Sequence, residues 1–203
     1  MCVSLLMPGG RRMNPFEFII IFFAFVYSLA LAHLLFAWTR MIRHRLQLTF
    51  SWPHLLWMLV AMFLLAVDWL STWDYRTFGK LSLLEISSVF LFVMLNYFFC
   101  ALVSPDFEGG ETFDLKRFHD AEGRTYILVF LATVTIAIVE NFLAGEMLGI
   151  TKEGAENALV LFQWPLGLLP LFVKRSWVQI VAPAAILVTI ITYAAMFYPV
   201  LMS

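Results

Sequence analysis

Acidic and amide side chains interrupt otherwise apolar stretches of the sequence, and their types could support chemistry. Asp68, Glu85, Glu140 and Asn141 each stand within or at the edge of a long apolar run. An ionised carboxylate inside hydrocarbon costs at least about 2.5–3.5 kcal/mol on insertion scales, so each acid needs a partner, a proton or water. Together the four residues predict a site for a small ion, a proton or another small ligand.

Two other interpretations account for the same carboxylates. In the first they are structural, with Asp68 paired with Arg76 or bonded to a nearby serine while Glu85 and Glu140 reach the polar interface. In the second they contact a partner subunit or the amine of a ligand. The choice among the three depends on whether the helices bring these acids together.

Two histidines suggest a different chemistry. His33 lies five residues before Trp38, and His54 two residues after Trp52, so both are expected near one membrane face on an antiparallel pair of helices. Two imidazoles on facing helices could ligate a metal or a b-type haem. The alternative is a pair of interfacial histidines bonded to lipid or backbone, and a protein without a cofactor is the preferred prediction.

The composition shows which medium surrounds these residues. Of the 203 residues, 62% are apolar and 13% are charged, whereas soluble domains have roughly 45–50% apolar and about 25% charged residues. A soluble chain needs more charge to cover its surface, so the sequence predicts an integral membrane protein whose main partner is the lipid bilayer. The net charge of −1 gives no reason to expect nucleic acid as a partner.

Six apolar stretches are long enough to cross a membrane. A crossing helix needs about 20 apolar residues, because each adds about 1.5 Å across a hydrocarbon core of about 30 Å. The predicted fold class is therefore all-α, a polytopic transmembrane bundle in one domain over residues 14–203, after a short flexible tail over 1–13. The predicted spans are approximately 16–38, 54–73, 81–103, 125–145, 156–173 and 177–201.

The basic residues predict how the bundle is oriented. The first, third and fifth loops hold eight Lys and Arg residues, and the other side holds five. The positive-inside tendency then places these three loops in the cytoplasm and both termini on the outer side. In this orientation Asp68, Glu85 and Glu140 form an outer-leaflet carboxylate cluster, with Asn141 beside it.

One long polar segment, residues 104–126, separates the third span from the fourth. We expect a solvated connector, and the alternative is a short interfacial helix in its central part, ETFDLKRFH. His44 and His119 fall in predicted loops, where their side chains are expected to be solvated.

Sequence signatures of common enzymes are missing from the chain. It contains no H-E-x-x-H, no G-x-S-x-G, no P-loop and no G-x-G-x-x-G. The two cysteines, Cys2 and Cys100, are far apart and lack the spacing of a zinc site. The sequence therefore predicts a protein that is not an enzyme.

Three segments carry a resemblance to a known group of proteins: NPFEFIIIFFAFVYSLALAHLLFAWTRMIRHR, SWPHLLWMLVAMFLLAVDWLSTW and NYFFCALVSPD. They resemble an uncharacterised family of small bacterial multi-pass inner-membrane proteins, over about the first half of the chain. The resemblance implies a location in the bacterial plasma membrane and no particular activity.

These observations predict a multi-pass membrane protein that conducts or senses a small ion, a proton or a small solute at its carboxylate cluster. The alternative is a non-catalytic accessory subunit of a larger membrane complex, respiratory or haem-containing. A membrane-protein partner or a homo-oligomer is compatible with both.

Overall fold

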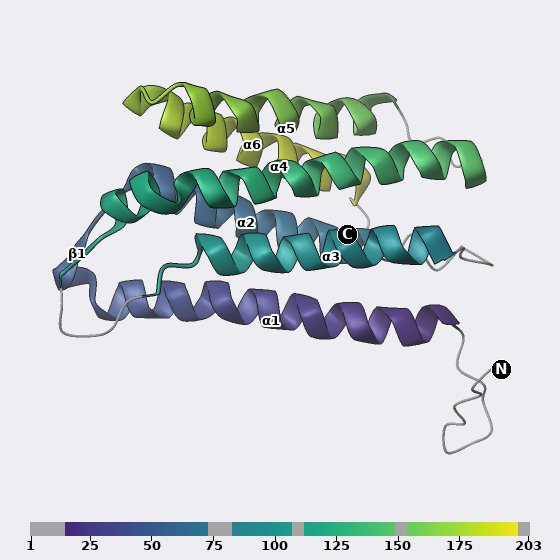
Figure 1. The fold of residues 1–203 in the computed structure, drawn as a ribbon, viewed down its shortest axis with the longest axis horizontal. Coiled ribbons are helices and arrows are strands. Elements are labelled where there is room, and N and C mark those ends of the chain that lie inside the picture. The colour runs from purple at the N-terminus through teal and green to yellow at the C-terminus, as the bar shows by residue number, and fades with distance from the viewer. Residues whose placement is uncertain (1–14, 73–82, 107–111, 149–153, 199–203) are drawn as a thin grey trace, which may run out of the picture.

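Helices make up nearly all of the structure. The computed structural model describes residues 15–72, 83–106, 112–148 and 154–198, and Figure 1 shows its helices lying side by side. The elements in chain order are α1 (Pro15–Arg43), the 3-10 helix η1 (Arg45–Gln47), β1 (Leu48–Thr49), α2 (Trp52–Ser71), α3 (Leu83–Val103), β2 (Phe113–Asp114), α4 (Leu115–Leu148), α5 (Gly154–Phe172) and α6 (Ser176–Phe197). The predicted all-α bundle is confirmed.

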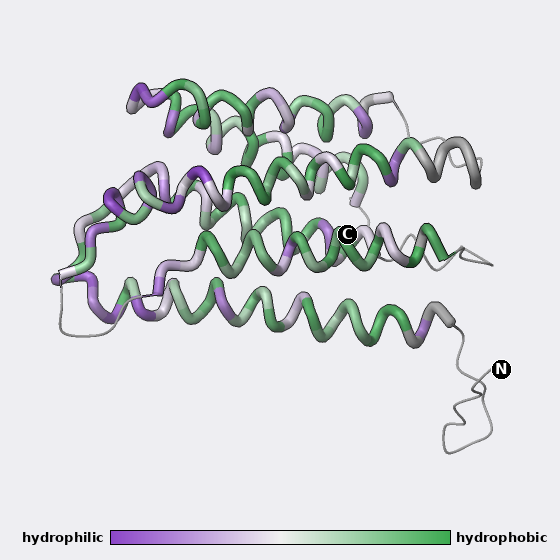
Figure 2. The backbone as a smooth tube through the Cα atoms, viewed as in Figure 1, coloured by the Kyte–Doolittle hydropathy of each residue, from purple (hydrophilic) through white to green (hydrophobic). Residues whose placement is uncertain are grey.

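Within the described ranges, five helices are long and apolar enough to cross a membrane: α1, α2, α3, α4 and α6. Figure 2 shows hydrophobic residues along the middle of the helices and hydrophilic ones gathered near β1. The chain is therefore an integral membrane protein of the multi-pass kind. The fifth predicted span corresponds to α5, which packs against α4 and α6, and its crossing stays a prediction. The expected tail over 1–13 lies outside the described residues.

Successive helices alternate in direction, so the start of α1 and the end of α6 lie at the same end of the bundle (Figure 1). We call this the terminal end, and the opposite end, where β1 and β2 pair, the ribbon end. Which membrane face each end meets stays a prediction from loop charge.

The second helix, α2, is the central element. It packs against α1, α3, α4 and α6. Half of the most apolar stretch of α2 is buried, whereas only 28% of the corresponding stretch is buried in α1 and in α6. Its buried side chains recur at helical spacing and include His54, Trp57, Ala61, Leu64 and Asp68. One enclosed helix therefore carries both a buried histidine and a buried aspartate.

A short parallel ribbon ties two loops together at the ribbon end. Leu48 pairs with Phe113 and Thr49 with Asp114. Nearby, the Arg40 guanidinium donates a hydrogen bond to the Asp106 carboxylate. This ion pair joins the end of α1 to the segment after α3, but its side chains are 49% and 91% exposed, so it adds little stability.

The fourth helix begins about ten residues earlier than the predicted span 125–145. Asp114 Oδ1 accepts hydrogen bonds from the backbone N–H groups of Lys116 (2.8 Å) and Arg117 (3.1 Å), which caps the helix. Buried residues then recur every four positions at Leu115, His119 and Gly123, so one face of this polar turn packs on the bundle. The solvated connector expected here is wrong for residues 115–124.

The fifth helix approaches the fourth closely at Gly167. A Cβ atom at this position would lie 2.8 Å from Leu131 Cδ2 and 3.0 Å from Phe130 Cε1. Leu131 can rotate, but Phe130 is fully buried and cannot easily yield. The missing side chain therefore allows α5 to pack against α4 despite its internal prolines, Pro165 and Pro170.

Substitution Gly167→Ala should therefore destabilise the protein. Overpacking of this kind costs about 1–3 kcal/mol, which lowers the thermal unfolding midpoint in detergent by roughly 2–10 °C. Gly154→Ala is the matched control, because a Cβ at Gly154 meets nothing within 4 Å. Equal midpoints for the two variants would contradict this account of the α4–α5 contact.

Candidate functional site

The buried aspartate lies near the terminal end of the central helix. Asp68 is 9% exposed and lies three residues, or about 4.5 Å of helix, before the last residue of α2. The hydroxyl of Ser71 donates to the Asp68 backbone carbonyl over 2.7 Å, and the Thr72 hydroxyl donates to the Trp69 carbonyl over 2.6 Å. These hydroxyl protons bond the backbone, so neither Ser71 nor Thr72 donates a hydrogen bond to the Asp68 carboxylate.

A second carboxylate and a tyrosine complete this region. Tyr193 on α6 is 8% exposed, and its hydroxyl donates a hydrogen bond of 2.8 Å to Glu156 Oε1 on α5. Asp68 lies at the same end of the bundle on α2, which packs against α6. We call Asp68, Glu156 and Tyr193 the acidic site, which brings together α2, α5 and α6.

Sequence reasoning missed two members of this site. Glu156 is the first residue of the predicted span 156–173, and Tyr193 lies in the apolar span 177–201, with no motif that marks either residue. The available signal was that both belong to helices in which polar groups are scarce. The pairing itself depends on which helix faces α2, and hydropathy does not contain that information.

The other residues of the predicted carboxylate cluster lie on α3 and α4. Glu140 and Asn141 are half-buried on α4, in the part of that helix toward the terminal end (Figure 1). The backbone of Glu85 belongs to α3, but its side chain lies outside the described residues, as does Arg76. The structure thus places Glu140 at the same end as Asp68, and the predicted cluster of Asp68, Glu85, Glu140 and Asn141 stays a prediction.

The two histidines proposed as a ligand pair have different neighbours. His33 Nε2 hydrogen-bonds the Tyr97 hydroxyl of α3 over 3.3 Å, whereas the His54 ring packs edge-on against Phe118 of α4, with ring centres 5.1 Å apart. They also differ in depth. α1 continues past Trp38, so His33 lies about 15 Å from the end of its helix and His54 about 3 Å from the start of α2.

A bis-histidine haem stays a prediction, and the surroundings of the two rings give it no support. Axial ligands must face one iron from opposite sides, and each of these rings packs against a different helix. Among the described residues, no group of three or more His, Cys, Asp or Glu side chains is placed to hold a metal ion.

A third histidine has a more defined environment than the sequence predicted. His119 is 7% exposed, its Nδ1 pairs with the Tyr126 hydroxyl, and its Nε2 lies 3.1 Å from Gln179 Oε1. The Gln179 amide nitrogen donates to the carbonyls of Pro170 (2.9 Å) and Val173 (3.0 Å). The expectation of a solvated loop residue is wrong, because His119 faces inward on the amphipathic first turns of α4.

These contacts assign the tautomer of His119. The amide nitrogen of Gln179 already donates to two carbonyls, so its oxygen is the acceptor that faces the imidazole. His119 Nε2 then carries the proton, and Nδ1 accepts a hydrogen bond from the Tyr126 hydroxyl. Because the two carbonyls belong to the last turn of α5 and the residue after it, one side chain of α6 joins α4 to the end of α5.

The fold and composition define a multi-pass α-helical membrane protein with a buried acidic site at one end. Comparison of the chain with protein-family models, with curated proteins and with solved structures found no match.

Substitution Gln179→Leu should destabilise the ribbon end, because it removes bonds to His119, Pro170 and Val173 at once. Leaving these groups buried without a partner costs about 1–3 kcal/mol, or roughly 2–10 °C in the thermal midpoint measured in detergent. The control is Gln47→Leu, because Gln47 is exposed in η1. A midpoint for Gln179→Leu equal to that of Gln47→Leu would show that this hydrogen-bond set does not stabilise the fold.

Proposed function

We propose that the protein binds a proton or a small cation at the acidic site and carries or senses that ion. The observation that supports this best is the burial of Asp68 at the end of the bundle where a buried tyrosine hydroxyl bonds a second carboxylate. Oxygen ligands of this kind suit hard cations, and ionisable residues inside membrane helices mark ion and proton pathways.

Charge neutralisation supplies the free energy for binding. A carboxylate held between apolar helices is costly while it is ionised, and a bound proton or cation removes much of that cost. Because the acidic site draws on α2, α5 and α6, its occupation changes the forces among three helices at once. An ion bound there therefore influences helix packing, which is what a carrier or a sensor requires.

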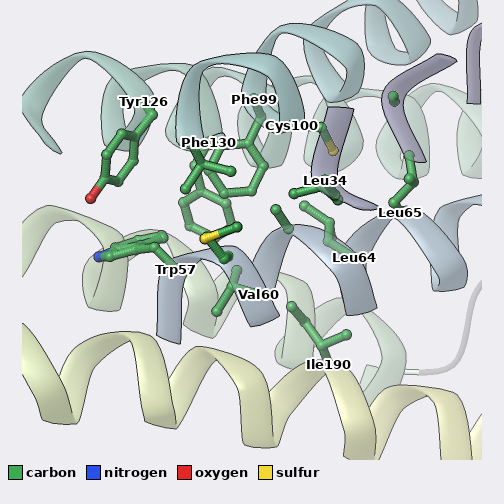
Figure 3. Close-up of a cluster of buried hydrophobic side chains, with 14 of the residues drawn as sticks. Leu34, Trp57, Val60, Leu64, Leu65, Phe99, Cys100, Tyr126, Phe130 and Ile190 are labelled. Carbon is green, nitrogen blue, oxygen red and sulfur yellow. The ribbon is translucent and has the colours of Figure 1, made fainter. Parts of the chain in front are cut away.

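The core of the bundle favours a carrier or a sensor over an open channel. Figure 3 shows large side chains from several helices meeting in the middle of the bundle. Trp57, Phe99 and Phe130 are fully buried there, and Leu64 and Ile190 pack beside them. A continuous water-filled path would require these side chains to move apart, so ions cross only when the helices rearrange.

The proposed orientation of the protein rests on the basic residues in its loops. The proposed type of membrane rests on the resemblance over the first half of the chain. We place the protein in a bacterial inner membrane with the ribbon end in the cytoplasm. The acidic site then faces the outer side.

Substitution Asp68→Asn should abolish ion movement through the protein. The flux of H⁺, Na⁺ and K⁺ through purified protein in liposomes is measured with ion-sensitive dyes. The thermal unfolding midpoint is measured as well, because an ion-dependent rise in this midpoint would report sensing without flux. Asparagine is close in size but has no charge to neutralise, so both signals should be lost. Asp120→Asn, at an exposed position on α4, should keep them. Unchanged signals in Asp68→Asn would remove Asp68 from the mechanism.

Substitution Tyr193→Phe should weaken binding without abolishing it. It removes the hydrogen bond to Glu156, and a loss of about 1–1.5 kcal/mol corresponds to a five- to tenfold higher half-saturating ion concentration. Tyr97→Phe, which removes a hydroxyl bonded to His33, is the matched control and should leave that concentration unchanged. Identical values for the two variants would place Tyr193 outside the site.

A further inference from the structure

A second cluster of polar side chains lies toward the ribbon end, away from the acidic site. Its rings surround Tyr126 of α4: the ring centre of His54 lies 6.2 Å away, and those of Trp57 and His119 each lie 6.0 Å away. We call these four residues the histidine cluster. It joins α2 to α4, and through the His119–Gln179 hydrogen bond it also reaches α6.

Three polar atoms of this cluster lack a partner among the described residues. They are both ring nitrogens of His54 and the indole nitrogen of Trp57. Both side chains are fully buried. A buried polar group left without a hydrogen bond costs about 1–3 kcal/mol, so three such atoms within one turn of a central helix call for partners that the described part of the chain does not supply. His119 differs from His54, because each of its ring nitrogens already has a hydrogen-bond partner.

The polar atoms of Trp57 and Tyr126 lie on the same side of the apolar cluster, and His54 belongs to the same helix face as Trp57. His54 and Trp57 are three residues apart on α2 and therefore share a face of the helix. In Figure 3 the indole nitrogen of Trp57 and the hydroxyl of Tyr126 project from the same side of the apolar cluster, away from Phe99 and Phe130. The imidazole of His54 packs against the Tyr126 ring on this helix face.

The hydrogen-bonding types of these atoms specify the partner. A neutral imidazole presents one N–H donor and one acceptor nitrogen, and an indole presents one N–H donor. The two nitrogens of one imidazole point in different directions, so separate partners must together accept two hydrogen bonds and donate at least one. A metal cation accepts none, and a halide ion donates none. A water molecule does both, and buried waters typically make two to four hydrogen bonds to polar groups of this kind.

The geometry points to an internal water site formed by His54 and Trp57, beside the Tyr126–His119 pair. Water there satisfies the buried nitrogens and hydrates the interior of the bundle at the end opposite the acidic site. The inference does not depend on the proposed function, because it uses none of the residues of the acidic site.

Pulsed hydroxyl-radical labelling of the wild-type protein in detergent, read residue by residue by mass spectrometry, tests this site. Radicals formed from bound water modify adjacent side chains even when bulk solvent does not reach them. After correction for intrinsic reactivity, Trp57 and Tyr126 should be labelled several times faster than Phe99 and Phe130, which are buried to the same extent. Equal protection of all four side chains would overturn the proposal.

Substitution His54→Phe provides the second arm of the test. Removing the imidazole takes away two of the three bonding atoms, so labelling of Trp57 and Tyr126 should fall to the rate of Phe130. His33→Phe is the matched control, since His33 packs against α3, and it should leave the labelling unchanged. Labelling that persists in His54→Phe would show that His54 holds no water. If this variant does not fold, the wild-type comparison alone decides.

Discussion

The enclosure of α2 by four other helices is the constraint on which the rest of the structure depends. A helix face exposed to lipid can be apolar throughout. The outer face of α1 is an example, because it carries Phe25 (70% exposed) and Phe36 (69% exposed). A helix surrounded by protein can carry polar groups, but only where its neighbours satisfy them, because the interior has no bulk water. Asp68 near one end and His54 near the other therefore determine which residues the adjacent helices must present.

The two ends of the bundle meet this requirement differently. At the ribbon end, His119 and Gln179 join three helices through neutral hydrogen bonds that fix donor and acceptor at each atom. At the terminal end, the Tyr193–Glu156 bond involves a carboxylate, so its strength depends on charge. Apolar side chains fill the space between. One end is thus held by hydrogen bonds between uncharged side chains, and the other by a hydrogen bond to a carboxylate.

Hydropathy located the helices, because the requirement for about 20 apolar residues is a property of the bilayer. It failed where polarity and helicity occur together: the first turns of α4 are polar, yet they bury His119 on one face. Hydropathy also placed the end of the first helix too early, at Trp38, whereas α1 continues to Arg43. Asp68 was predictable as a charge in an apolar run. The hydrogen bond between Tyr193 and Glu156 at the same end was not, because that bond depends on how helices pack around one another.

The parallel pairing of β1 with β2 has a consequence for how the chain is made. Leu48 leaves the ribosome before α3 exists, and its partner Phe113 leaves after α3 is complete. The ribbon therefore cannot close while the first hairpin of helices is entering the bilayer, since a parallel pair needs the intervening chain to cross back first. Because of this order of synthesis, the β1–β2 pairing can form only after α1, α2 and α3 have been made, just before α4 begins.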